Sequence, residues 1–199
     1  NGLYRYDGSE FTLFSLDGDE DATKYSINCI YLTSDEKLYV GTDNYGLYMY
    51  DNGTFQRVSE MYNLGVSTIN AMYEDDNKNL WIAASSGIFR LSSDGAEALA
   101  DDVVSGLSVG NISGHGDYVY AIANNDILIT VDPERHVSIT NKSEYRVDDI
   151  NSLYVDENGN RYYGSAGYSI LKIGTDGKNE IINTGNLHGI NKIYSDGDN

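Results

Sequence analysis

Short apolar segments alternate with polar turns along the whole chain, and they recur with a fixed period. Each begins with an aliphatic residue, followed by two mostly polar positions and a second apolar residue. The five copies are Ile27-Asn28-Cys29-Ile30, Ile69-Asn70-Ala71-Met72, the decayed Val109-Gly110-Asn111-Ile112, Ile150-Asn151-Ser152-Leu153 and Ile190-Asn191-Lys192-Ile193. Their starts lie 42, 40, 41 and 40 residues apart. A period near 40 residues with short strands is typical of a β-propeller, in which each repeat forms one four-stranded blade.

The first complete repeat predicts the four strands of such a blade. Its hydrophobic positions fall in the segments 27–32, 38–42, 47–50 and 55–58, which polar turns separate. The turn Asp51-Asn52-Gly53-Thr54 favours a tight hairpin, because Asn-Gly adopts the positive φ angles that this turn needs. The segment 59–67 is expected to cross to the next blade.

The repeats predict one all-β unit, a β-propeller of four-stranded antiparallel blades with about five repeats of ~41 residues. The expected blades are residues 27–68, 69–108, 109–149 and 150–189, with partial blades at 1–26 and 190–199. Two arrangements remain open. The chain is a fragment of a larger propeller, which the absence of an initiator Met, a signal peptide and capping repeats favours. Alternatively, it is a five-bladed ring closed by termini that share the last blade.

The charge of the chain limits its partners. It carries 13 Lys and Arg residues against 31 Asp and Glu residues, a formal net charge of −18. This field repels phosphate, so we expect no nucleic-acid partner and no membrane contact by this segment. Most carboxylates fall in turns and favour solubility; a docking surface for a basic partner is the alternative.

Cysteine and histidine usage predicts neither a disulfide nor a metal site. Cys29 is the single cysteine and lies among apolar residues, so it is expected to act as a small buried side chain. The histidines His115, His136 and His188 are far apart and share no metal-ligand spacing. We therefore expect no metal and no cofactor.

Two acidic segments look like calcium loops at first sight. Asp156–Asn160 occupies the same slot as Asp75–Asn79 in the second repeat, so a hairpin turn explains it better. The run Asp17-Gly18-Asp19-Glu20-Asp21 offers alternate carboxylates, but Asn28 stands where an EF-hand has its bidentate Glu. An exposed connection between blades is favoured there, and calcium binding stays an open question.

No catalytic motif is present in the sequence. It contains no Gly-x-Ser-x-Gly elbow, no phosphate-binding Gly-Lys-Ser/Thr loop and no His-Glu-x-x-His pair. Acidic pairs are too frequent to indicate a glycosidase, for which the separation of the two carboxylates decides. We therefore expect that the chain is not an enzyme.

Two segments carry a family pattern. Asp75–Ala83 is followed by Gly87–Leu91, and Leu38–Thr42 is followed by Tyr45–Asp51, each pair giving a second and a third strand. They resemble the two-component regulator propeller repeat, and residues 109–132 match that repeat weakly. The resemblance implies a periplasmic or extracellular sensor module of a bacterial signal-transduction protein, with a histidine kinase or diguanylate cyclase output outside this chain. Many such modules sense breakdown products of complex carbohydrates.

The ligand face follows from strand direction. Alternating strands place the loops between second and third strands on the same face as the crossovers between blades. These loops carry amide, hydroxyl and aromatic groups, which suit a sugar. The candidate ligand-binding residues are Asp43, Asn44, Tyr45, Ser85, Ser86, Asn124, Asn125 and Tyr168. The repeated Asn28, Asn70, Asn151 and Asn191 are expected to hydrogen-bond the backbone of a neighbouring turn.

Three functions remain open at the level of sequence. The leading one is a sensory module that binds a neutral oligosaccharide or a similar solute. The second is a protein-interaction or dimerisation scaffold without a small ligand, which self-associates through its terminal blades. The third is a propeller lyase or hydrolase, which would need His, carboxylate or metal groups at one mouth of the channel; the dispersed histidines argue against it.

Overall fold

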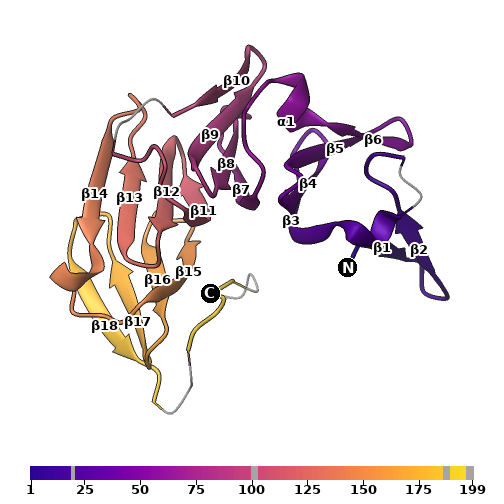
Figure 1. Ribbon diagram of the computed structural model, residues 1–199. Helices are drawn as coiled ribbons and strands as arrows, with labels where there is room; N and C mark the ends of the chain where they lie inside the picture. The colour runs from indigo at the N-terminus through magenta and orange to yellow at the C-terminus, as the bar shows by residue number, and fades with distance from the viewer. Residues whose placement is uncertain (19–20, 100–102, 186–188, 196–199) are drawn as a thin grey trace.

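The computed structural model shows an arc of β-sheets and describes residues 1–18, 21–99, 103–185 and 189–195 (Figure 1). Four sheets contain four antiparallel strands each. Blade 1 contains β3 (Ser26–Leu32), β4 (Leu38–Asp43), β5 (Leu47–Asp51) and β6 (Thr54–Arg57). Blade 2 contains β7 (Ile69–Glu74), β8 (Leu80–Ala84), β9 (Gly87–Ser92) and β10 (Gly95–Ala98). Blade 3 contains β11 (Val109–His115), β12 (Tyr118–Ala123), β13 (Ile127–Val131) and β14 (Val137–Asn141), and blade 4 contains β15 (Ile150–Val155), β16 (Arg161–Ser165), β17 (Ser169–Ile173) and β18 (Asn179–Asn183).

The strand order within each blade follows the chain, so the predicted propeller fold is confirmed. The first strands β3, β7, β11 and β15 lie toward the centre of the arc, and the fourth strands lie outside (Figure 1). One local prediction was wrong. Val58 was expected to end a fourth strand, but it begins the short helix α1 (Val58–Met61) in the crossover to blade 2. Its side chain is buried there, so the apolar residue serves the helix packing instead of the strand.

Every first strand contains a β-bulge near its start. The register of pairing shifts between Ile27 and Cys29 in β3, and equivalent shifts occur in β7, β11 and β15. A bulge leaves one extra residue outside the ladder and redirects its side chain. The bulged residues are Asn28, Asn70, Gly110 and Asn151. The repeated asparagines therefore mark the bulges of the innermost strands.

The hydrophobic core lies between the blades. One cluster joins Leu47 and Val58 of the first repeat to Ile69 and Ile82 of blade 2. Close approach of neighbouring blades requires a small residue: a Cβ added at Gly41 would lie 2.7 Å from a methyl carbon of Ile69. Each blade thus shares its core with its neighbours, as in other repeat proteins.

In the described residues, the two ends of the arc form neither a complete blade nor a strand pairing that closes a ring. β1 (Leu3–Tyr6) and β2 (Phe11–Phe14) form a two-stranded sheet beside blade 1, in the segment where a partial blade was expected. Within the described residues, no strand pairing joins this sheet to the C-terminal segment, so the ring with a shared blade is not observed. The described residues also contain no helix of the length and apolarity needed to cross a bilayer.

The first strand expected at residues 190–193 is not formed. Ile190 still occupies the place of a first-strand residue, because a Cβ at Gly164 would lie 2.5 Å from its methyl carbon. Its N–H donates to the carbonyl of Ser165. A first strand is defined by pairing with the second strand of its own blade, and no described strand pairs with this segment.

Candidate functional site

The loops between second and third strands lie on the same face as the crossovers, as strand direction predicts. The loops between second and third strands bond to the crossover that leads into the next blade: Asn44 N–H donates to Thr68 Oγ1, and Ser85 N–H donates to the carbonyl of the same threonine. The pattern recurs in blade 3, where Asn124 N–H donates to the carbonyl of Ser108. The loops and the crossovers therefore share one face.

Most of the predicted site residues are exposed on this face. Asn44, Ser85, Ser86, Asn124, Asn125 and Tyr168 are exposed, while Asp43 and Tyr45 are partly buried. The carboxylate of Asp43 accepts a hydrogen bond of 3.1 Å from Thr68 Oγ1, so it helps to fix the crossover.

Tyr45 also has a packing role. Its ring lies edge-to-face against Tyr25, with 4.9 Å between ring centroids, and the Lys24 ammonium lies 5.5 Å from its centroid. The same cluster contains the buried ring of Tyr48. Sequence reasoning treated Tyr45 as a loop residue, and nothing in its local motif signals the contact with residue 25.

The repeated asparagines tie neighbouring blades together. Asn28 Nδ2 donates to the carbonyl of Ile69 at 3.1 Å, and Asn70 Nδ2 donates to the carbonyl of Val109 at 2.7 Å. The acceptor is thus the first strand of the next blade, not a turn, because the bulge directs the side chain across the channel edge. We call each such bond an amide clasp.

In the two later blades the clasp moves by one residue. Blade 3 has Gly110 at its bulge, and Asn111 donates instead, to the carbonyl of Asn151 at 3.1 Å. In blade 4 the residue after the bulge also makes the hydrogen bond: Ser152 Oγ donates to the carbonyl of Ile190 at 3.2 Å. The third copy of the motif, decayed in sequence, therefore keeps the function of its amide.

One of the loop residues is hydrogen-bonded to one of the repeated asparagines, between blades 3 and 4. Asn125 Nδ2 donates to Asn151 Oδ1 at 2.9 Å, and the carbonyl of Asn125 accepts from Ile150 N–H at 2.9 Å. Asn125 belongs to the predicted ligand loops, and Asn151 belongs to the repeated asparagines. The loop between β12 and β13 is therefore bonded to the start of the first strand of blade 4.

First-strand residues of the four blades and the C-terminal segment 191–193 line a central cavity of about 580 Å³. Its wall includes Asn28, Asn70, Asn111, Ser152 and Lys192. Neither the loop residues nor Asn151 belong to the wall, although sequence reasoning placed the ligand at the loops alone. The cavity has a volume within the range of about 300–1,000 Å³ that is usual for small-ligand sites.

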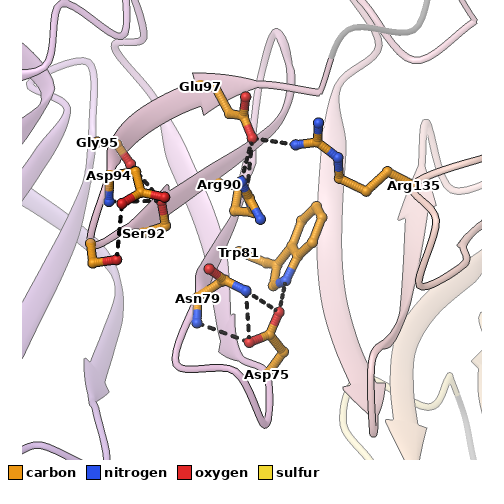
Figure 2. Close-up of polar contacts among 10 residues, drawn as sticks. Asp75, Asn79, Trp81, Arg90, Ser92, Asp94, Gly95, Glu97 and Arg135 are labelled. Carbon is orange, nitrogen blue, oxygen red and sulfur yellow. Dashed lines mark hydrogen bonds and ion pairs between the residues drawn. The ribbon is translucent and has the colours of Figure 1, made fainter.

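A second polar cluster lies at the outer boundary between blades 2 and 3. Glu97 Oε1 accepts from Arg90 of its own blade and from Arg135 of blade 3 (Figure 2). Below it, the indole N–H of Trp81 donates to Asp75 at 2.7 Å. Trp81 is 4% exposed and packs with apolar residues of blade 3, so it is buried between the two blades.

The calcium-like segments have other roles where they are described. Asp156 accepts from the N–H and the side chain of Asn160, which confirms the hairpin turn. Asp17 Oδ2 accepts from the hydroxyl groups of Tyr25 and Tyr48, at 2.9 and 2.8 Å. Residues 19 and 20 of the acidic run lie outside the described residues.

Sequence reasoning missed one potential metal-binding group. Asp132, Glu134 and His136 offer ligand atoms that all lie within 4.8 Å of one another, in the turn between β13 and β14. The signal in the sequence is the alternating spacing of an aspartate, a glutamate and a histidine at 132, 134 and 136. Asp132 also accepts from the N–H and the ring of His136, which explains the cluster as a turn. His188 lies outside the described residues.

The single thiol is poorly suited to nucleophilic chemistry. Burial raises the pKa of Cys29 to about 11. Because the thiolate is the reactive form, little of it is present near neutral pH. The side chain instead packs against blade 2 in the cluster around Ile69.

The comparisons with known proteins agree with this architecture. Residues 63–86 match the family model described as two component regulator propeller. Comparison with curated proteins gives no significant match. Among solved structures, the chain is similar to extracellular domains of two putative hybrid two component systems from B. thetaiotaomicron. For the first, the TM-score is 0.72 and the sequence identity 22%, and the alignment covers 95% of this chain and 29% of that chain. For the second, the TM-score is 0.74 and the sequence identity 15%, and the alignment covers 94% of this chain and 27% of that chain.

Another similar structure is virginiamycin B lyase from Staphylococcus aureus, with a TM-score of 0.64, 13% identity, and coverage of 87% of this chain and 59% of that chain. At these identities the likeness establishes the fold alone, and the chain spans less than a third of the two extracellular domains. The matched segment 63–86 contains β7, β8 and the Asp75–Trp81 hydrogen bond. Residues 63–86 therefore match the two component regulator propeller model, within a propeller fold that the chain shares with extracellular domains of putative hybrid two component systems.

Proposed function

We propose that this chain is an extracytoplasmic sensory module, periplasmic or extracellular, which binds a neutral oligosaccharide or a similar solute and catalyses no reaction. The propeller repeat and the fold shared with extracellular domains of two component systems support a sensor. The observation that carries the ligand class is the loop face, where amide and hydroxyl groups are exposed and Asn125 Nδ2 donates to Asn151 Oδ1. Hydroxyl-rich solutes satisfy such groups without charge.

Replacing Tyr168 with Ala is expected to weaken binding of a neutral oligosaccharide while leaving the melting temperature nearly unchanged. The side chain is 51% exposed on the loop face, where a ring stacks on a sugar, and exposed loop residues contribute little to the core. Tyr45→Ala, in contrast, is expected to lower the melting temperature as well, because that ring packs on Tyr25. Calorimetric titration with neutral oligosaccharide pools and thermal unfolding measure the two effects.

Tyr118→Ala is the matched control, since this tyrosine is 44% exposed but lies at the β11–β12 turn, away from the loop face. Affinity should be insensitive to salt, because the contacts involve no ion pairs. Equal losses from Tyr118→Ala and Tyr168→Ala, or binding that disappears at moderate salt, would refute this site.

A self-associating scaffold is the second candidate, and the β1–β2 sheet favours it. Tyr4, Tyr6, Phe11 and Leu13 are 48%, 57%, 71% and 38% exposed on these two strands. Contiguous exposed apolar surface commonly marks an interaction site. Light scattering over a concentration series is expected to show association that Phe11→Ser reduces. A monodisperse monomer at all concentrations would remove this candidate.

A further inference from the structure

The amide clasps fix the orientation of three side chains at the channel. A carbonyl group can only accept a hydrogen bond, so the nitrogen of each amide must face the carbonyl of the next blade. Asn28, Asn70 and Asn111 all make this contact. Their Oδ1 atoms are therefore directed away from the neighbouring strand. The assignment of amide oxygen and nitrogen follows from the chemistry of the partner.

These oxygen atoms are available for a ligand. None of the three accepts a hydrogen bond from the described part of the chain, and all three residues line the central cavity. Ser152 does not belong to this set, because it is 3% exposed and its Oγ packs against Gly164 and donates to the carbonyl of Ile190. Three consecutive blades thus present acceptor oxygens to one cavity of about 580 Å³.

The cavity wall is almost uncharged, in contrast to the rest of the molecule. The chain contains 31 Asp and Glu residues, yet among the described residues Lys192 is the only charged one in the wall. A hard cation would need carboxylate ligands, which the wall lacks. An anion would meet a molecule with a net charge of −18. The chemistry of the wall therefore fits an uncharged ligand that donates hydrogen bonds.

We propose that this cavity is the recognition site for a neutral, polyhydroxylated ligand, whose hydroxyl groups donate to the amide oxygens of Asn28, Asn70 and Asn111. The proposal rests on the proposed sensory function and moves the centre of recognition from the loops to the channel. Apolar side chains such as Ile30, which is 54% exposed in the wall, face the C–H surfaces of a sugar ring. Asn151 links the loops to the wall indirectly, because its Oδ1 accepts from Asn125 and its carbonyl accepts from the wall residue Asn111.

The first test varies the donors of the ligand. Neutral oligosaccharides that bind in calorimetry are compared with their per-O-methylated forms, which keep the ring and the acceptors but lose every hydroxyl donor. We expect methylation to abolish binding, because the amide oxygens can only accept. Equal binding of both forms would overturn the proposal, as would tighter binding of a uronate analogue that Lys192→Gln removes.

The second test varies the acceptors of the protein. Asn111 and Ser152 occupy the same position after the bulge in neighbouring blades, and both donate to the next first strand. Asn111→Ser therefore retains a clasp but withdraws the amide oxygen. We expect Asn111→Ser to weaken binding by about 5–10-fold, which corresponds to the loss of one hydrogen bond.

The outcomes separate this proposal from the proposed function. If Tyr168→Ala removes binding while Asn111→Ser leaves it unchanged in a protein with the wild-type melting temperature, the channel proposal fails and the sensory function stands. If no neutral oligosaccharide binds to the folded chain, both fail. Loss of binding in Asn111→Ser at an unchanged melting temperature supports the channel site.

Discussion

Trp81→Ala is expected to lower the free energy of unfolding by about 3–5 kcal/mol, the range for deletion of a large buried aromatic side chain. The indole is 4% exposed and packs with residues of blade 3, including Ile112 and Val119. The substitution opens a cavity at a blade boundary and breaks the hydrogen bond to Asp75. Urea denaturation followed by circular dichroism measures the change.

The chain offers a matched control for this prediction. The position of Trp81 is occupied by Tyr39, Tyr120 and Tyr162 in the other three blades. Trp81→Tyr is therefore expected to cost much less than Trp81→Ala, because a tyrosine fits this position elsewhere in the arc. Equal losses of stability for the two variants would show that the position does not depend on aromatic packing.

Asp75→Ala has the second largest expected effect. This carboxylate is 6% exposed and accepts from the backbone N–H of Asn79, from its side chain, and from Trp81 Nε1 (Figure 2). Removing it leaves the buried indole N–H without a partner, and each such orphaned donor costs about 1–3 kcal/mol. The turn between β7 and β8 also loses its bond to Asn79. The free energy of unfolding in urea measures the sum.

A double-mutant cycle tests whether these effects are linked. Asp75→Ala combined with Trp81→Phe should cost less than the sum of the single changes, because phenylalanine leaves no indole donor to satisfy. Asp156→Ala is the control in blade 4, where the longer 3.2 Å contact comes from the hydroxyl of Tyr162 and the site is less buried. Additive effects of Asp75→Ala and Trp81→Phe would contradict the proposed hydrogen-bond role.

The repeat and its strands could be predicted from sequence because their signals are local. Alternation of apolar residues set the strands, and Asn52-Gly53 marked the hairpin between β5 and β6. Predictions failed where a residue depends on a distant partner. Val58 lies at the end of an apolar run, but packing in the crossover makes it helical. Ile190 has the first-strand signature without a described strand to pair with.

The candidate site was only partly accessible to sequence reasoning. The loop face followed from strand direction alone, and the hydrogen bonds to the crossovers bear this out. The central cavity could not be found, because its wall combines residues from several repeats that are about 40 positions apart. The clasp of Asn111 was hidden for another reason. In blade 3 the residue after the bulge, Asn111, contacts the neighbouring blade. Gly110, at the position where the other copies have asparagine, therefore looked like the loss of the repeat motif.

The clasp has a consequence for how such arrays grow. In every blade the side chain is the donor, while the acceptor is a main-chain carbonyl of the next blade. A main-chain acceptor is present whatever residue occupies that position. A duplicated or transplanted repeat therefore contains its own side-chain donor, and the main chain of its new neighbour supplies the acceptor without a matching mutation. Gene duplication can lengthen this kind of propeller one repeat at a time, and each new boundary is joined as soon as it is made.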